Sequence, residues 1–243
     1  MVNKILSILI AFFFVSCEKI AIQHNTLNEV KKLASRRIID LDVECLTFDG
    51  KVKKLKLNVL DTCSESIRAI FKELLDKRFP IYAAACYNNK TISRSKNPSI
   101  HAYGTAIDIN YLMNPFYIMQ KGTTSIIPSR DIDRGKDEQQ ISGELRKINL
   151  TENEINAVLK VVIQPEGSDD WFMNRALPRK GMITSDQVKI FKKNGFDIWG
   201  GEWSQPIDFM HFQCSKELAY KMISAKNNDE AKELWDNHLK SLK

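Results

Sequence analysis

Residues 99–110 of the chain read Ser99-Ile100-His101-Ala102-Tyr103-Gly104-Thr105-Ala106-Ile107-Asp108-Ile109-Asn110. This segment places the imidazole of His101 and the carboxylate of Asp108 seven residues apart. Both groups are ligand types that zinc accepts. Gly104 and Ala106 between them are small, as expected where the backbone folds closely around a metal or a substrate. Spacing alone makes this a weak indication, because a histidine and an aspartate often occur near each other.

A second segment supplies a third ligand and a further carboxylate. It reads Trp199-Gly200-Gly201-Glu202-Trp203 and continues with Asp208-Phe209-Met210-His211-Phe212. A catalytic zinc typically has three protein ligands and keeps a fourth position for water, and a separate carboxylate then takes the proton as that water attacks. The sequence therefore predicts a Zn2+ site formed by His101, Asp108 and His211. Asp208 has the place of the general base.

The two segments, in this order, resemble the metal motifs of the VanY-type D-alanyl-D-alanine carboxypeptidases and of the related L-alanyl-D-glutamate endopeptidases. The likeness continues through Asn114-Pro115 and Gly181-Met182-Ile183 and covers roughly residues 43 to 214. It implies the zinc peptidase fold that this family shares with hedgehog signalling domains. That fold is α+β, a small antiparallel sheet with flanking helices, which agrees with strand signals that do not alternate with helices.

The resemblance also implies roles around the metal. His101, Asp108 and His211 would bind zinc and Asp208 would be the general base. Arg94 would polarise the scissile carbonyl and stabilise the oxyanion. The segment around Arg94 can equally be an exposed polar loop, and Arg78 or Arg134 could take its role.

Two more parts of the motifs have less specific roles. Ser99, by the same resemblance, would contact the substrate. For Trp199 and Trp203, packing beneath the site is at least as well supported as substrate contact.

The substrate implied by the resemblance is a stem peptide of peptidoglycan. It would be cut either at the terminal D-Ala-D-Ala bond or between L-Ala and D-Glu. We favour the carboxypeptidase, because Arg94, Lys90 or Lys96 can hold the free terminal carboxylate that an exopeptidase must recognise.

Two alternatives come from other classes of protein. Hedgehog domains keep the zinc and serve chiefly as binding modules, so the first is a zinc-containing cell-wall binding module without peptidase activity. Retention of Asp208 and Arg94 favours the enzyme, since a binding module needs no base beside the metal. The second, a structural lipoprotein, requires the whole set of motifs to be coincidental.

The N-terminus predicts export. Lys4 precedes an apolar run from Ile5 to Val15, which is shorter than the roughly 20 residues of a membrane-spanning helix. We interpret residues 1–16 as a signal peptide. Val15-Ser16-Cys17 resembles the lipobox of bacterial lipoproteins, so the protein is expected in the periplasm or cell envelope, with membrane contact only through a lipid anchor at Cys17.

The length, the charge and the cysteine count limit the class of protein but do not indicate a function. The 243 residues hold 36 Lys+Arg and 30 Asp+Glu, a formal charge of +6 that is too diffuse to indicate nucleic acid. Residues 17–42 are expected to be a polar linker, and residues 43–243 one zinc peptidase domain. The remaining cysteines allow two disulfides in three connectivities, or four buried thiols, and the sequence does not choose between them: Cys45, Cys63, Cys86 and Cys214.

Periodicity and turn signals predict the following elements. Strands are expected at 43–48 and 52–59, joined by the Asp49-Gly50 turn, and at 81–85. Helices are expected from about 67 to before Pro80, from a capping box of Thr151 and Glu154, at 185–194, and in the last segment, where His238 should be packed against the core. A surface loop is expected at 129–140.

Overall fold

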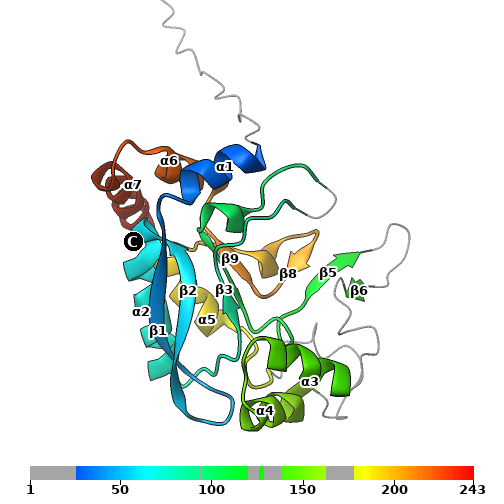
Figure 1. Ribbon diagram of the computed structural model, residues 1–243. Coiled ribbons are helices and arrows are strands. Elements are labelled where there is room, and N and C mark those ends of the chain that lie inside the picture. Colours follow the sequence, from blue (N-terminus) through cyan, green and yellow to red (C-terminus); the bar gives the residue numbers. More distant parts are fainter. Residues whose placement is uncertain (1–25, 93–94, 120–125, 129–137, 163–177) are drawn as a thin grey trace, which may run out of the picture.

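The computed structural model describes residues 26–92, 95–119, 126–128, 138–162 and 178–243 (Figure 1). The helices are α1 (Leu27–Ala34), α2 (Ser64–Asp76), α3 (Glu138–Lys147), α4 (Glu152–Val162), α5 (Ser185–Lys193), α6 (Lys216–Ser224) and α7 (Asn228–Ser241), with the short 3-10 turns η1 (Asp61–Cys63), η2 (Ile100–Tyr103) and η4 (Gly200–Glu202). The strands are β1 (Ile38–Leu46), β2 (Val52–Leu60), β3 (Ala84–Ala85), β4 (Ala106–Ile109), β5 (Phe116–Met119), β6 (Ile126–Pro128), β7 (Ile198–Trp199), β8 (Ile207–Asp208) and β9 (His211–Gln213).

A long antiparallel hairpin of β1 and β2 forms one side of the molecule (Figure 1). Its register pairs Leu46 with Val52, so the turn falls at Asp49-Gly50 as predicted. Leu57 and Val59 of β2 are buried while Lys56 and Asn58 are exposed, the alternation of a strand with one face buried.

The fold begins before the predicted domain boundary at residue 43. Residues 27–42, which the sequence analysis places in a polar linker, form α1 and the first half of β1. Thr26 and Glu29 make a capping box at the start of α1, and Val30 and Ala34 are fully buried. Leu27 and Leu33 also pack against the core, so the apolar residues of α1 do recur at helical spacing, and the prediction of a polar linker overlooked this short period.

The predicted helices are present. α2 buries Ile67, Ile70 and Phe71 and ends at Asp76, before Pro80. α4 starts from the expected capping box, in which the Glu154 carboxylate accepts from the backbone and hydroxyl of Thr151. α5 ends before Gly195, and α7 buries Trp235.

Two predictions change. The strand expected at 81–85 is reduced to β3, because Pro80 and Ile81 pair with Leu46 at the end of β1 instead. Of the loop expected at 129–140, residues 129–137 lie outside the described residues, and residues 138–140 form the first turn of α3.

The architecture is α+β, as predicted, with small antiparallel sheets. Besides the hairpin there is a four-stranded sheet in the order β3-β4-β9-β7 and a three-stranded sheet in the order β6-β5-β8. The main core lies between the hairpin, α2, the four-stranded sheet, α5, α6 and α7. A second apolar cluster joins α3 and α4 to the turn after β4.

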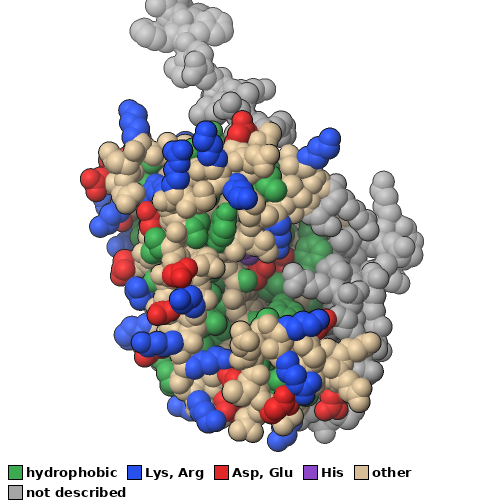
Figure 2. All heavy atoms as spheres, viewed as in Figure 1, with side chains coloured by type: hydrophobic (Ala, Val, Ile, Leu, Met, Phe, Trp, Pro, Cys, Tyr) green, Lys and Arg blue, Asp and Glu red, His purple; other side chains and the backbone are tan. Residues whose placement is uncertain are grey.

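The surface of the protein carries mixed charges, and the cysteines of its folded part are buried. Lysine and arginine side chains are spread among acidic ones over the face shown in Figure 2. Among the described residues, no helix is long and apolar enough to cross a membrane. All four cysteines of the folded part are buried free thiols, which agrees with the second of the two alternatives.

Candidate metal centre

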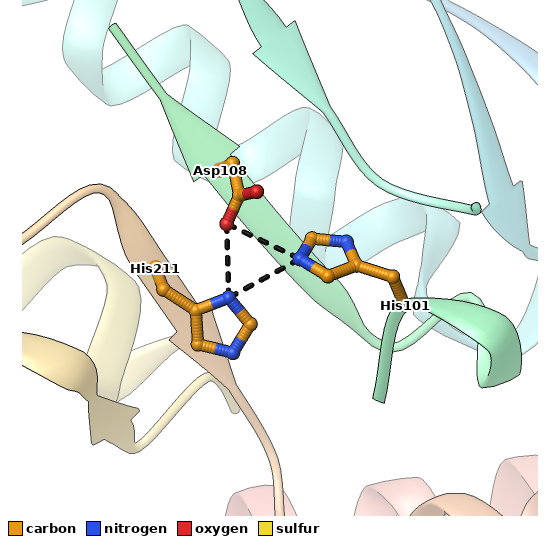
Figure 3. Close-up of side chains that lie close together, drawn as sticks. All are labelled: His101, Asp108 and His211. Atoms are coloured by element: carbon orange, nitrogen blue, oxygen red, sulfur yellow. Dashed lines mark hydrogen bonds and ion pairs between the residues drawn. The ribbon is translucent and has the colours of Figure 1, made fainter. Parts of the chain in front are cut away.

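Three side chains converge on one point of the four-stranded sheet (Figure 3). His101 Nε2 lies 3.2 Å from His211 Nδ1, and Asp108 Oδ1 lies 3.2 Å from the first and 2.9 Å from the second. In a tetrahedral zinc site with ligands at about 2.0–2.1 Å, neighbouring ligand atoms are about 3.3 Å apart. The spacing and the two-nitrogen, one-oxygen donor set therefore fit zinc with one position left for water or substrate.

Strand pairing explains why two of these residues meet. β4 and β9 are antiparallel and their register places Asp108 directly opposite His211. Side chains of directly opposed residues share a face of the sheet and have their Cβ atoms about 4.5–5.5 Å apart. The first and second sequence motifs are therefore neighbouring strands of one sheet.

The third ligand comes from a turn that leads into β4. Ser99 caps η2, and its hydroxyl accepts the backbone N–H of His101 at 3.4 Å. Ser99 is itself buried, so the contact that the structure shows for it supports His101; its predicted contact with substrate stays a prediction.

Gly104 has a different reason for being small than the one expected. Its φ is +73°, in the left-handed region, and a Cβ there would stand 2.5 Å from Ile38 Cδ1 and 2.9 Å from the Leu60 nitrogen. The close approach is to the β1–β2 hairpin and not to the metal or the substrate. Gly104 thus docks the η2 turn on the hairpin.

Outer contacts select which ring nitrogens face the centre. His101 Nδ1 donates to the carbonyl oxygen of Cys86 at 2.6 Å, and His211 Nε2 donates to Gln213 Oε1 at 2.8 Å. In a neutral imidazole the other nitrogen then carries a lone pair. Those nitrogens, Nε2 of His101 and Nδ1 of His211, are the ones in the triangle.

The buried charges reinforce one another. Burial alone would raise the pKa of the Asp108 carboxyl, but the charges and hydrogen bonds of the two imidazoles outweigh it and hold that pKa below its ordinary value. Burial would lower the pKa of His211, and the contact with Asp108, helped by the nearby charge of Asp208, raises it instead. A cation fits this site, because it would bind the carboxylate and replace the imidazole proton.

The glycines of the second motif make room for Asp208. A Cβ on Gly200 would stand 2.4 Å from the carbonyl oxygen of Asp208 and 2.8 Å from its Cβ. A Cβ on Gly201 would stand 2.3 Å from the ring of Trp199. η4 and β8 therefore pack backbone to backbone, and Asp208 lies outside the three-residue cluster but near enough to affect His211.

The two tryptophans have different environments. The indole N–H of Trp199 donates to the carbonyl of Phe209 at 3.0 Å, and its ring lies nearly parallel to that of Phe212, which stacks on Phe191. Trp203 is half-buried, with its ring centroid 5.4 Å from that of His211. Trp199 is thus a packing residue, and Trp203 forms part of the surface beside the metal ligands.

The candidate cations differ in how far the structure describes them. Arg94 and Arg134 lie outside the described residues, and Arg78 is exposed just after α2. The described residues on either side of 93–94 meet: Thr91 pairs with Pro98, and the Ser99 N–H donates to the carbonyl of Lys90 at 2.9 Å. Lys90 is therefore held beside the residue that caps the His101 turn, whereas Lys96 is exposed farther along the loop.

Two buried amides, Asn110 and Asn114, lie just after the strand that carries Asp108, and their contacts were not predicted from the sequence. Asn110, with φ of +48°, accepts the backbone N–H of Tyr82 and donates to the carbonyls of Pro80 and Gly181. Asn114 also donates to Gly181 and accepts from Ile183 at 2.7 Å. These contacts connect Asn110, Asn114 and the segment 181–183, which all belong to the stretches that resemble the family. That shared resemblance was the signal from which the contacts could have been predicted.

Comparison with known proteins agrees with the site. Residues 146–214 match the family model described as D-alanyl-D-alanine carboxypeptidase. The match includes Asp208 and His211 and leaves His101 and Asp108 outside. No curated protein and no solved structure gives a significant match.

The fold and the site define an α+β protein with three side chains placed to hold a metal ion, and the match over residues 146–214 supports a metallopeptidase that acts on peptidoglycan. Over residues 146–214 it confirms the resemblance to the D-alanyl-D-alanine carboxypeptidase family of zinc peptidases that the second motif indicated, and the first motif lies outside the matched residues.

Proposed function

We propose that the protein is a zinc-dependent D-alanyl-D-alanine carboxypeptidase that trims peptidoglycan stem peptides. The observation that carries this proposal is the His101, Asp108 and His211 triangle, with a lone pair of each imidazole turned inward, in a chain whose adjoining segment matches that family. His101, Asp108 and His211 would hold the metal. When bound there, zinc polarises the scissile carbonyl and makes a water acidic.

Side chains of the protein supply the proton transfer and the contacts with the substrate. Asp208 accepts the proton from the attacking water and passes it to the leaving amine. Trp203, beside His211, forms an apolar wall against which the substrate lies. Arg94 stabilises the developing oxyanion, and Ser99 contacts the substrate.

The choice of carboxypeptidase rests on cations near the site. An exopeptidase must bind the free C-terminal carboxylate of its substrate, and a charge-assisted hydrogen bond from Lys or Arg does this. The backbone of Lys90 is hydrogen-bonded to Ser99, two residues from a proposed metal ligand, and Arg94 follows Lys90 by four positions in the sequence. The L-alanyl-D-glutamate endopeptidase is the alternative within the same family.

A pair of substrates tests the choice. The protein is incubated with a pentapeptide stem ending in D-Ala-D-Ala and with the same peptide amidated at its C-terminus, and the products are identified by mass. The carboxypeptidase releases D-Ala from the first and loses most activity on the second. Equal cleavage of both between L-Ala and D-Glu would identify the endopeptidase, and no cleavage with any divalent metal would favour the zinc-containing binding module.

We also propose that the protein is an exported lipoprotein of the cell envelope. The apolar run before Cys17 supports this, as does the substrate, which lies in that compartment. The mature chain should begin at Cys17 and sediment with membranes, and Cys17→Ser should release it into the soluble fraction. A full-length chain in the cytoplasm with Met1 retained would contradict the proposal.

A further inference from the structure

Gln213 lies beside the metal centre without being a ligand. It is the last residue of β9, two positions after His211. Because side chains alternate along a strand, residues two apart point to the same face. Pairing with Ala106 on one side and Ile198 on the other holds its backbone on both edges.

Both ends of the Gln213 amide are used. Oε1 accepts the Nε2–H of His211 at 2.8 Å, and the amide nitrogen donates to the carbonyl oxygen of Cys214 at 3.2 Å. The Cys214 carbonyl is only an acceptor, so it attracts the NH2 end and leaves the oxygen end for His211.

The reversed amide would disable the ligand. It would place two acceptor oxygens, Gln213 Oε1 and the Cys214 carbonyl, against each other. It would also donate a hydrogen to His211 Nε2, which moves the imidazole proton to Nδ1. Nδ1 is the atom in the metal triangle, so a proton there would remove the lone pair that binds the metal.

We propose that Gln213 is a positioning residue, which sets the tautomer and ring orientation of His211 and thereby the affinity of the site for zinc. The proposal rests on the proposed zinc function. His101 is oriented by a backbone carbonyl, that of Cys86, which no side-chain substitution removes. For His211 the corresponding contact is a side chain, so its contribution can be measured.

The test uses Gln213→Met and Gln213→Glu in the folded, full-length protein. Methionine has a similar length and no acceptor for Nε2–H, whereas glutamate keeps an acceptor. Loss of a hydrogen-bonding partner behind a metal-bound histidine typically weakens metal binding about 10- to 100-fold. We expect that loss in Gln213→Met and a zinc affinity nearer the wild-type value in Gln213→Glu, measured by competition with a chelator of known affinity.

A second measurement reads the tautomer directly. In metal-free protein labelled with nitrogen-15 histidine, at a pH where the imidazoles are neutral, Asp108 competes for a proton on Nδ1 of His211, so NMR should show both tautomers. The fraction of His211 protonated at Nε2 should be larger in the wild type and in Gln213→Glu than in Gln213→Met. This readout requires neither zinc nor peptidase activity, so it can fail or succeed independently of the proposed function.

Gln187→Met is the matched control. Gln187 accepts from the backbone and hydroxyl of Thr184 at the start of α5, away from the histidines. It should lower thermal stability without changing zinc affinity. Zinc affinity in Gln213→Met within about twofold of wild type would overturn the proposal, since an outer ligand contact should matter far more. Should Gln213→Met not fold, loss of the Nε2–H tautomer in Gln213→Glu would overturn it equally.

Discussion

The backbone of Gly200 lies directly against that of Asp208, so close that a methyl group on Gly200 would overlap the Asp208 carbonyl oxygen. Gly200→Ala should therefore displace Asp208. A misplacement of about 1 Å can cost about 10²-fold in rate. We expect kcat to fall by about that factor while the protein stays folded and retains zinc.

Gly143 provides the control for this substitution, because a Cβ there would meet nothing within 4 Å. Gly143→Ala lies in α3 and should leave turnover unchanged while stabilising the helix by about 1 kcal/mol. Normal turnover in Gly200→Ala would show that Asp208 does not need its present position.

The metal ligands give the most direct prediction. Wild-type protein should hold about one zinc per chain, and His101→Ala or His211→Ala should lose most of it, because two ligands remain of three. Metal analysis of the purified variants measures this. His238→Ala is the control: its ring contacts the Gly195 carbonyl and Asp197 and not the three clustered side chains, so zinc content should not change.

Asp208→Asn separates the enzyme from the binding module. The substitution keeps the size of the side chain and removes its basicity, so turnover should fall by roughly 10²-fold or more with zinc still bound. The control is Glu202→Gln. Glu202 belongs to the same sequence motif as Asp208, but its carboxylate is exposed and paired with Lys192 of α5. Equal activity of wild type and Asp208→Asn would count against a role for Asp208 as the base.

The stability of the metal-free protein should depend on pH through His211. Its pKa is raised in the folded state, against the effect of burial, by contact with Asp108. The stabilisation is therefore fully present below the ordinary histidine pKa of about 6.5 and is lost as the pH rises through the higher folded value. Zinc needs the neutral imidazole, so its stabilisation changes in the opposite direction.

Thermal unfolding at a series of pH values measures both effects. The difference in Tm between zinc-loaded and metal-free protein should widen as the pH rises from about 6 to 8. Asp108→Asn should weaken or reverse the dependence of the metal-free protein, because the partner charge is gone and burial then acts to lower the pKa of His211. A difference that stays constant with pH would contradict the assigned coupling of His211 and Asp108.

The metal ligands could be predicted from sequence because zinc restricts residue type, and the order of the two motifs restricts position. The helices α2, α5 and α7 were predictable because each buries one regular apolar stripe. The roles of Gln213 and Asn110 could not be predicted, since an amide side chain can serve many purposes. The role of Gln213 depends on strand register and that of Asn110 on tertiary contacts. The first turn of α3 carries too few apolar residues to show a period, whereas α1 shows one over only eight residues and was predicted to be part of a linker.

The triangle joins a turn at residue 101 to a strand 110 positions later in the chain. A metal bound there would also cross-link the chain and close a long loop, whose closure costs conformational entropy. The donors of Asp108 and His211 meet through the register of β4 with β9, so the complete three-donor site exists only after these strands have paired. If the chain is exported before it folds, it would therefore cross the membrane without its metal and take the metal from the compartment in which it folds.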